Sequence, residues 1–164
     1  MFTVVASVSL PYPPEAVYAA VASVEGTVRW QAGVRGVWRA RPAAALPPLV
    51  LHYWALGVRH RLRTRVTAHV PHERFAYRAE GDGIAFDVTF GVAPTRYGCH
   101  VACTMILRAD DAAAPDSEGA PGPADLVRLR RLLTRRLPRD LARLEAWVAV
   151  QPGASQRAAV GVPV

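Results

Sequence analysis

Residues 58–70 alternate strictly between two kinds of side chain, and this pattern constrains the fold more than any other feature of the sequence. Arginine occupies every second position from 59 to 65, and His60, Leu62 and Thr64 stand between them. Because successive side chains on a strand point to opposite faces, the pattern predicts one long strand with a buried face and a charged face. The buried face carries His60 and Thr64 among aliphatic residues, so it is either an ordinary core or the wall of a ligand cavity.

The charge of the chain suggests a polyanionic partner, but its composition weakens that suggestion. The formal net charge is +7 over 164 residues, and all 20 basic residues are arginine. Lysine and asparagine are both absent, whereas alanine and proline are abundant, as is typical of a GC-rich genome. We therefore interpret most of the charge as surface solvation. Nucleic acid is disfavoured as a partner, and a transient contact with an anionic membrane is left open.

The sequence also carries expectations about compartment and chemistry. No apolar run approaches the ~18–20 residues of a membrane-spanning helix, and no secretory signal is visible, so a cytoplasmic protein is expected. Cys99 and Cys103 lie four residues apart on an expected strand, about 13 Å from each other, which is too far for a disulfide. The histidines show no metal-ligand spacing, so neither a metal nor a cofactor is expected. Monomer and homodimer are both left open.

The order of periodic segments predicts a single domain over residues 1–149. Residues 2–10 alternate as a first strand, a short helix begins near Pro14, and a second short helical turn carries Trp30. A meander of strands is expected at 34–40, 49–56, 58–70, 74–80, 84–93 and 99–108. Residues 109–124 contain four acids and no base, which is typical of a flexible acidic loop, and the tail 150–164 is expected to be disordered.

Turn chemistry lets the faces of the strands be assigned. A two-residue turn at Leu56-Gly57 places Tyr53 beside His60, and later turns place Tyr77 and Phe86 on the same face. On the opposite face, the same count places Arg65 opposite Glu80 and Asp87 diagonal to Arg78. Such pairs predict a charged, solvated face that is crossed by opposite-charge pairs.

From Asp125 to Ala149 the period becomes helical. Leucines recur every three or four residues, Asp125 is expected to cap the helix, and Pro138 is expected to kink it without ending it. Arg130 and Asp140 fall in or beside the apolar stripe, so they are the helix residues most expected to be buried and polar. The alternative is that the kink turns Asp140 outward to an arginine.

This order of elements resembles the helix-grip fold of the START-like (SRPBCC) superfamily, an α+β fold with a curved antiparallel sheet of about seven strands. The superfamily includes plant pathogenesis-related allergens and polyketide cyclase/dehydrase-like proteins. The segments that carry the resemblance are Pro11 to Tyr18, Val24 to Trp30, Arg65 to Pro71, Gly98-Cys99 and Asp140 to Leu144. The resemblance implies that the long helix crosses the concave face of the sheet and encloses an apolar cavity, with the short helices closing one end.

The leading functional hypothesis is binding or transport of a hydrophobic small molecule, such as a lipid, polyketide, quinone or other ring-containing ligand. The candidate cavity lining is Trp30, Trp38, Leu51, Tyr53, His60, Leu62, Thr64, Tyr77, Phe86, Phe90, Met105, Arg130, Leu133 and Leu137. The alternative is a polyketide cyclase or dehydratase, which needs an acid or base facing the cavity. The sheet supplies no such carboxylate, so catalytic residues stay unassigned and enzymatic activity stays open. A further alternative is a ribosome- or RNA-associated protein that uses the arginine-rich faces.

Overall fold

The computed structural model describes residues 1–39, 49–109 and 122–151. Most of the expected acidic loop 109–124, and the tail beyond residue 151, lie outside the described residues. The elements are β1 (Phe2–Leu10), α1 (Pro14–Ala22), α2 (Val24–Trp30), β2 (Val34–Arg39), β3 (Leu49–Ala55), β4 (Val58–Val70), β5 (Arg74–Gly81), β6 (Ile84–Thr95), β7 (Gly98–Ala109) and α3 (Pro123–Ala149).

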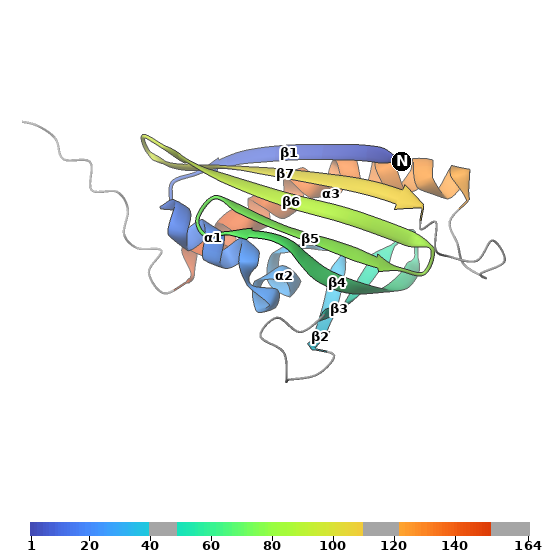
Figure 1. Cartoon of the computed structure of the whole chain (residues 1–164). Coiled ribbons are helices and arrows are strands. Elements are labelled where there is room, and N and C mark those ends of the chain that lie inside the picture. Colours follow the sequence, from blue (N-terminus) through green and yellow to red (C-terminus); the bar gives the residue numbers. More distant parts are fainter. Residues whose placement is uncertain (40–48, 110–121, 152–164) are drawn as a thin grey trace, which may run out of the picture.

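The seven strands form one antiparallel sheet in the order β1-β7-β6-β5-β4-β3-β2. Figure 1 shows the sheet curving in front of α3, with α1 and α2 at one end of the molecule. Helix α3 packs against β1, α1 and α2. The fold is therefore the α+β helix grip that the order of elements predicts. No helix in the described ranges is long and apolar enough to cross a membrane.

Two tight turns set the register of the central strands. Leu56 and Gly57 have φ values of 52° and 80°, and Asp82 and Gly83 have φ values of 49° and 76°. Positive φ at both central residues is what a type I′ hairpin turn requires. The first turn pairs Tyr53 with His60, as the sequence predicts.

A bulge in β4 overturns part of the predicted register. The β4–β5 pairing shifts by one residue between Val66 and Ala68, so Arg65 lies opposite Arg78 and Glu80 lies opposite Arg63. The prediction that Arg65 faces Glu80 is wrong by two positions. The turn after β4 pairs Val70 with Arg74 and is one residue shorter than the predicted pairing requires, and the extra residue of the bulge adds the second position. The prediction of a diagonal Asp87 is also wrong, since Asp87 lies directly opposite Arg78.

The same bulge changes which side of the sheet the end of β4 presents. Beyond it His69 pairs with Phe75, and their rings lie 6.3 Å apart. His69 also meets the buried ring of Tyr18 from α1 at 5.7 Å. The strict alternation places His69 on the charged face, whereas the structure places it on the concave side against α1.

Helix α3 closes the concave face with one apolar stripe. From Leu129 onward its stripe residues are at most 5% exposed, namely Leu129, Leu133, Leu137, Leu141, Leu144 and Val148, whereas Leu126 is partly buried. The helix continues through Pro138 as expected, but its N-cap is Gly122 and not Asp125. Asp125 instead stands in the first turn, where its Oδ2 accepts a hydrogen bond from the Gly122 N–H at 3.3 Å.

Candidate ligand-binding site

Three small pockets lie along the concave side of the sheet. The first, near the short helices, is lined by Val21, Ala22, Ser23, Thr27, Leu49, Leu51, Thr64, Val66, Phe75 and Tyr77. The second is lined by Gln31, Val34, Leu51, Tyr53, Leu62, Tyr77, Ala79, Phe86, Val88 and Met105. The third, against α3, is lined by Gln31, Tyr53, Phe90, Cys103, Met105, Leu133, Arg136, Leu137 and Asp140.

The pockets are neighbours separated by shared side chains. Leu51 and Tyr77 border both the first and the second pocket. Gln31, Tyr53 and Met105 border both the second and the third. The three therefore form an interrupted series that runs from the short helices to α3.

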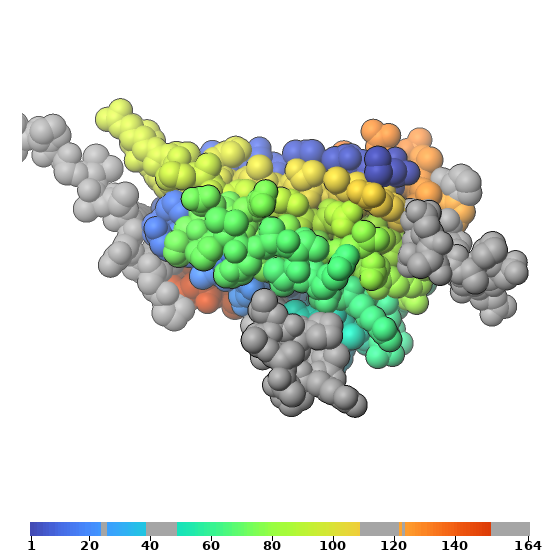
Figure 2. Space-filling view, viewed as in Figure 1, coloured from blue at the N-terminus to red at the C-terminus, as the bar shows by residue number. Residues whose placement is uncertain are grey.

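The interior is nearly filled in this conformation. The cavity volumes are about 40, 20 and 20 Å³, whereas sites for drug-sized ligands occupy roughly 300–1,000 Å³. The space-filling view (Figure 2) shows the outer side of β4 and β5, which lies opposite the concave side that carries these pockets. An interior ligand would have to displace the side chains that divide the series.

Asp140 supplies a buried carboxylate to the third pocket. It is 5% exposed, and its Oδ1 accepts a hydrogen bond from the Ala32 N–H at 3.0 Å. The Nη1 of Arg143 lies 3.5 Å from the same oxygen. Burial raises the pKa of Asp140 above its ordinary value, against the opposing effects of the Ala32 hydrogen bond and of Arg136 and Arg143. The carboxyl is therefore easier to protonate than an exposed one.

Arg136 reaches from α3 to β3 and holds Tyr53. Its Nη1 donates to the Tyr53 hydroxyl at 3.3 Å and to the Trp54 carbonyl at 3.0 Å. Its guanidinium carbon lies 5.8 Å from the centre of the Tyr53 ring. Burial raises the pKa of Tyr53, although Arg136 opposes the shift. Because the hydroxyl oxygen accepts from Arg136, its proton is directed to an acceptor elsewhere.

Tyr77 and Gln31 form the next polar pair along the series. Gln31 is 9% exposed at the end of α2, and its side chain hydrogen-bonds the Tyr77 side chain. Burial raises the pKa of Tyr77, so the phenol is neutral at physiological pH. Together with Tyr53 and Asp140, this pair makes a buried polar cluster that could bind the hydroxyl or carbonyl groups of a ligand.

The two cysteines are buried and free, as the sequence predicts. Burial raises the pKa of Cys103 to about 12 and that of Cys99 to about 11. Both thiols are therefore protonated at neutral pH and poorly nucleophilic. Within the described residues no group of three His, Cys, Asp or Glu side chains is arranged to hold a metal ion.

Most of the candidate lining residues border these pockets. They are Leu51, Tyr53, Leu62, Thr64, Tyr77, Phe86, Phe90, Met105, Leu133 and Leu137. The Thr64 hydroxyl donates to the Leu49 carbonyl at 3.0 Å, which ties it to the neighbouring strand. That these residues contact a ligand stays a prediction.

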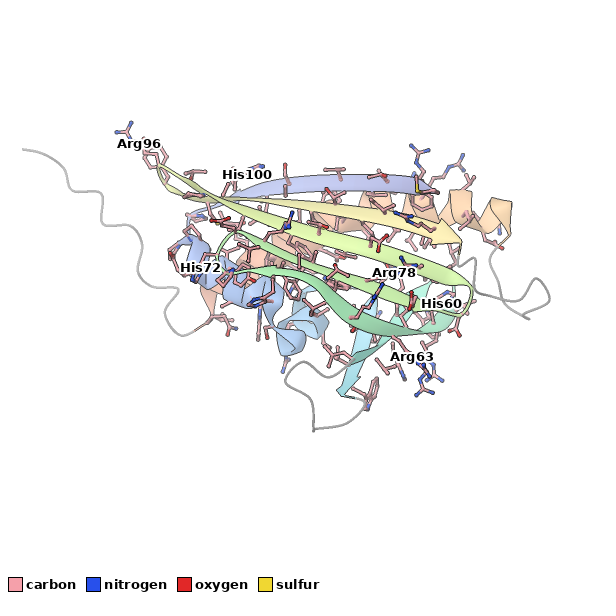
Figure 3. The ribbon with its side chains drawn as sticks, in the orientation of Figure 1. His60, Arg63, His72, Arg78, Arg96 and His100 are labelled. Carbon is pink, nitrogen blue, oxygen red and sulfur yellow. The ribbon has the colours of Figure 1, made fainter. Side chains whose placement is uncertain are left out.

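Trp30 and His60 are buried, but neither borders the three pockets. Trp30 is 1% exposed and packs edge-to-face on Phe90 at 5.7 Å. Among the described residues, neither the Trp30 Nε1 nor the His60 Nδ1 has a hydrogen-bond partner. Figure 3 labels His60 near the end of the sheet. Burial lowers the pKa of His60, which favours the neutral ring.

Two candidate lining residues point away from the interior. Trp38 is 53% exposed and stacks on His52 at 4.1 Å on the convex face. The prediction fails because a bulge between Val34 and Gly36 reverses the alternation of β2. Arg130 is exposed on α3. This corrects its assignment to the lining, which followed from its place close to two full turns before the buried Leu137 and so on the same side of the helix.

Sequence reasoning missed Arg136 and Gln31 and left Asp140 undecided. Asp140 meets an arginine, as the alternative for it expects, yet it stays buried. The signal for Arg136 is its place directly before the buried Leu137, which sets it at the margin of the apolar stripe. The signal for Gln31 is its place directly after the buried Trp30, where a helix end meets the sheet.

The close approach of Gly33 to this cluster supports a specific prediction. A Cβ added at Gly33 would collide with the Tyr53 ring and with Nη1 of Arg136. We expect Gly33→Ala to destabilise the protein by about 1–3 kcal/mol through this overpacking and to displace Tyr53. Gly91→Ala is the matched control, because a Cβ there meets no atom within 4 Å. Equal losses in the two variants, measured by urea unfolding, would contradict the prediction.

Comparisons with known proteins agree with this architecture. The model of the family described as polyketide cyclase / dehydrase and lipid transport matches residues 1–149. No curated protein matches the sequence. The Zhui aromatase/cyclase of Streptomyces sp. R1128 superposes with a TM-score of 0.73 at 19% identity, covering 98% of this chain and 99% of that one.

Two further solved structures show the same fold. A protein of Thermus thermophilus is 23% identical with a TM-score of 0.68, covering 90% of this chain and 97% of its own. A START superfamily protein of Mycobacterium smegmatis is 20% identical with a TM-score of 0.67, covering 89% and 96%. The chain thus belongs to the polyketide cyclase/dehydrase and lipid-transport family of START-like proteins.

Proposed function

We propose that this protein binds an apolar, ring-containing small molecule between the concave face of the sheet and α3. The observation that carries the proposal is that a series of apolar pockets leads to a buried cluster of hydroxyl, amide and carboxyl groups. An apolar wall with a few convergent polar groups is the usual composition of a small-molecule site. The proposal places this binding in the cytoplasm, as the sequence predicts.

The chemistry of the wall selects the class of ligand. The ring centres of Phe86 and Tyr53 lie 5.5 Å apart. Leu62 and Met105 complete an apolar surface around them. Such a surface favours rings through dispersion and offset stacking. The Tyr53 hydroxyl and the Asp140 carboxyl then suit a ligand with a carbonyl or hydroxyl at one end. The family and the fold of the Zhui aromatase/cyclase support a ligand of this kind.

The first test is native mass spectrometry of freshly purified protein, followed by solvent extraction. A stoichiometric apolar molecule would support the proposal and give the ligand class. A ligand-free protein whose Tm does not rise with any lipid, quinone or aromatic polyketide would overturn it, because a ligand at 100 times its Kd stabilises a protein by about 2.7 kcal/mol.

The Tyr53 hydroxyl should contribute measurably to binding. We expect Tyr53→Phe to weaken affinity for an extracted or polyketide-like ligand by roughly 2- to 10-fold, the usual value of one hydrogen bond. Tyr97→Phe is the control, because Tyr97 is 64% exposed at the far end of β6–β7. Titration calorimetry that gives the same Kd for both variants would show that the ligand does not use Tyr53.

One observation favours a second candidate function, a cyclase or dehydratase. Asp140 is a buried carboxyl with a raised pKa in a pocket, which is the property of a general acid or base that works near neutral pH. In such a reaction Asp140 would, as a base, accept the proton that leaves the reacting carbon, or would, as an acid, donate a proton to the hydroxyl that leaves as water. Tyr53, with Arg136 behind it, would stabilise the developing oxyanion.

A further inference from the structure

The tip of the β3–β4 hairpin exposes apolar side chains on both of its faces. Trp54 is 44% exposed, Leu56 41% and Val58 54%. Leu56 stands in the two-residue turn, and Trp54 and Val58 belong to opposite faces of the strand pair. The tip is therefore an apolar wedge, which nothing in the described part of the chain covers.

A row of arginines begins directly behind this tip on the convex face. Cross-strand pairing joins Trp54 to Arg59, His52 to Arg61 and Val50 to Arg63. Arg65 continues the row, and alternate residues of a strand are about 6.7 Å apart, so the row extends roughly 20 Å. Figure 3 shows Arg63 at the rim of the molecule, apart from Arg78 over the middle of the sheet.

Neighbouring acids do not neutralise this row. Glu80 lies opposite Arg63, but its carboxylate binds Nε of Arg78 at 2.8 Å. Asp82 accepts from the backbone N–H of Arg61 at 2.7 Å and does not pair with its guanidinium. Within the described residues, the guanidinium groups of Arg59, Arg61, Arg63 and Arg65 make no ion pair. The predicted pair of Arg65 with Glu80 is absent, because the shorter turn and the bulge together place Glu80 opposite Arg63.

Aromatic side chains lie on the same face. Trp38 and His52 stack there beside the arginine row, since His52 is the cross-strand partner of Arg61. Trp38 is 53% exposed. Tryptophan rings beside arginines are favoured at the boundary between water and lipid headgroups. We call this face of β2–β4, together with the hairpin tip, the hairpin surface.

We propose that the hairpin surface docks the protein on an anionic lipid membrane, with the tip of Trp54, Leu56 and Val58 inserted among the headgroups. The arginine row is complementary to anionic headgroups and adds electrostatic attraction to the apolar contact. Single-stranded nucleic acid fits the surface less well. Leu56 and Val58 offer no ring on which a base could stack, and a wedge does not present a continuous platform.

The docking surface adjoins the proposed ligand site without depending on it. Arg136 bonds both the Trp54 carbonyl at the tip and the Tyr53 hydroxyl inside. A membrane contact that moves the tip would therefore shift Arg136 and change its hydrogen bond to Tyr53. Docking itself is measured on ligand-free protein, so its failure and that of the ligand proposal are separate results.

The test is co-sedimentation of the full chain with vesicles of equal parts phosphatidylcholine and phosphatidylglycerol, compared with phosphatidylcholine alone. We expect binding to the anionic vesicles only. The triple variant Arg59→Gln/Arg61→Gln/Arg63→Gln should bind on the order of 100-fold more weakly, at about fivefold for each arginine. The control Arg131→Gln/Arg135→Gln/Arg139→Gln removes the same charge from exposed positions of α3 and should bind within a few-fold of the wild type.

A second variant separates insertion from charge. Trp54→Ser/Leu56→Ser keeps every charge and should still lose at least 10-fold in vesicle affinity, with its fold checked by circular dichroism. Equal losses in the two arginine triples would overturn the proposal in favour of non-specific attraction. Absence of vesicle binding would overturn it as well. Tighter binding to a single-stranded RNA than to anionic vesicles at equal salt would replace the membrane with nucleic acid.

Discussion

Replacing Asp140 with asparagine is expected to stabilise the folded protein at neutral pH, although it removes an ion pair with Arg143. The asparagine oxygen can still accept the hydrogen bond of Ala32, and the cost of burying a charge disappears. A raised pKa means that the surroundings of Asp140 favour the neutral group over the ionised one. A neutral side chain of the same shape should therefore fit better than the carboxylate.

The raised pKa of Asp140 also determines how the free energy of unfolding changes with pH. The folded-state pKa of Asp140 lies above its ordinary value of 3.8, so the folded protein binds this proton more tightly than the unfolded chain. The wild type then loses stability as the pH rises from about 3.8 through the folded-state pKa, by about 1.4 kcal/mol for each unit between the two values. Urea unfolding at several pH values should show that the advantage of Asp140→Asn is absent in acid and grows as the pH rises above about 3.8. An advantage that does not change with pH would contradict this assignment.

The same substitution distinguishes the two candidate functions. In a cyclase or dehydratase that uses Asp140 to move a proton, turnover of a polyketide-like substrate should fall by roughly 10²- to 10⁴-fold, with the Kd nearly unchanged. In a protein that only binds its ligand, the Kd alone can change. Asp87→Asn, on the outer face with its arginines, is the matched control for loss of a carboxylate. Turnover that survives in Asp140→Asn would exclude Asp140 as the acid or base.

Replacing Leu141 with alanine is expected to lower the free energy of unfolding by about 3 kcal/mol, within the 2–5 kcal/mol usual for buried leucines. Leu141 is fully buried in the core formed by α3 and the sheet. The loss combines the hydrophobic transfer of the removed atoms with the cavity that they leave. Val127→Ala on the same helix is the control, because Val127 is 52% exposed and should change stability by less than about 0.5 kcal/mol.

Urea unfolding measures both variants, and the slope of the transition should stay constant. A loss below about 1 kcal/mol for Leu141→Ala would mean that α3 does not pack on the sheet as described. A comparable loss for Val127→Ala would mean that the outer face of α3 is covered in solution.

The elements of this fold were predictable because each has a strong period, and the errors in register follow from two bulges and one turn that is shorter than expected. Alternation from 58 to 70 and leucine spacing from 126 to 148 specify a strand and a helix with little competition. A bulge adds one residue without disturbing the composition of the strand, so the sequence contains no clear sign of it. The exposed Trp38 comes from such an inserted residue, and the pairing of Arg65 with Arg78 comes from another together with a turn after β4 that is one residue shorter than predicted.

The site was predictable on the sheet and poorly predictable on the helix. Tyr53 and Tyr77 were found because strand alternation and turn length assign a face to each residue. Arg136 and Asp140 stand at the margins of the helical stripe, where a helical wheel leaves the direction of a long side chain open. Only the position of β3 relative to α3 decides that Arg136 reaches Tyr53.

The divided interior has a consequence for the speed of binding. Since Leu51, Tyr77, Tyr53 and Met105 stand between these three interior pockets, none of the three is large enough in the closed molecule for a ring system to enter. Association must then wait for a transiently opened form, and the observed affinity is reduced by the fraction of molecules in that form. The observed rate of loading should therefore level off at high ligand concentration instead of rising in proportion to it. Release must wait for the same opening, so such a protein would exchange its bound ligand slowly.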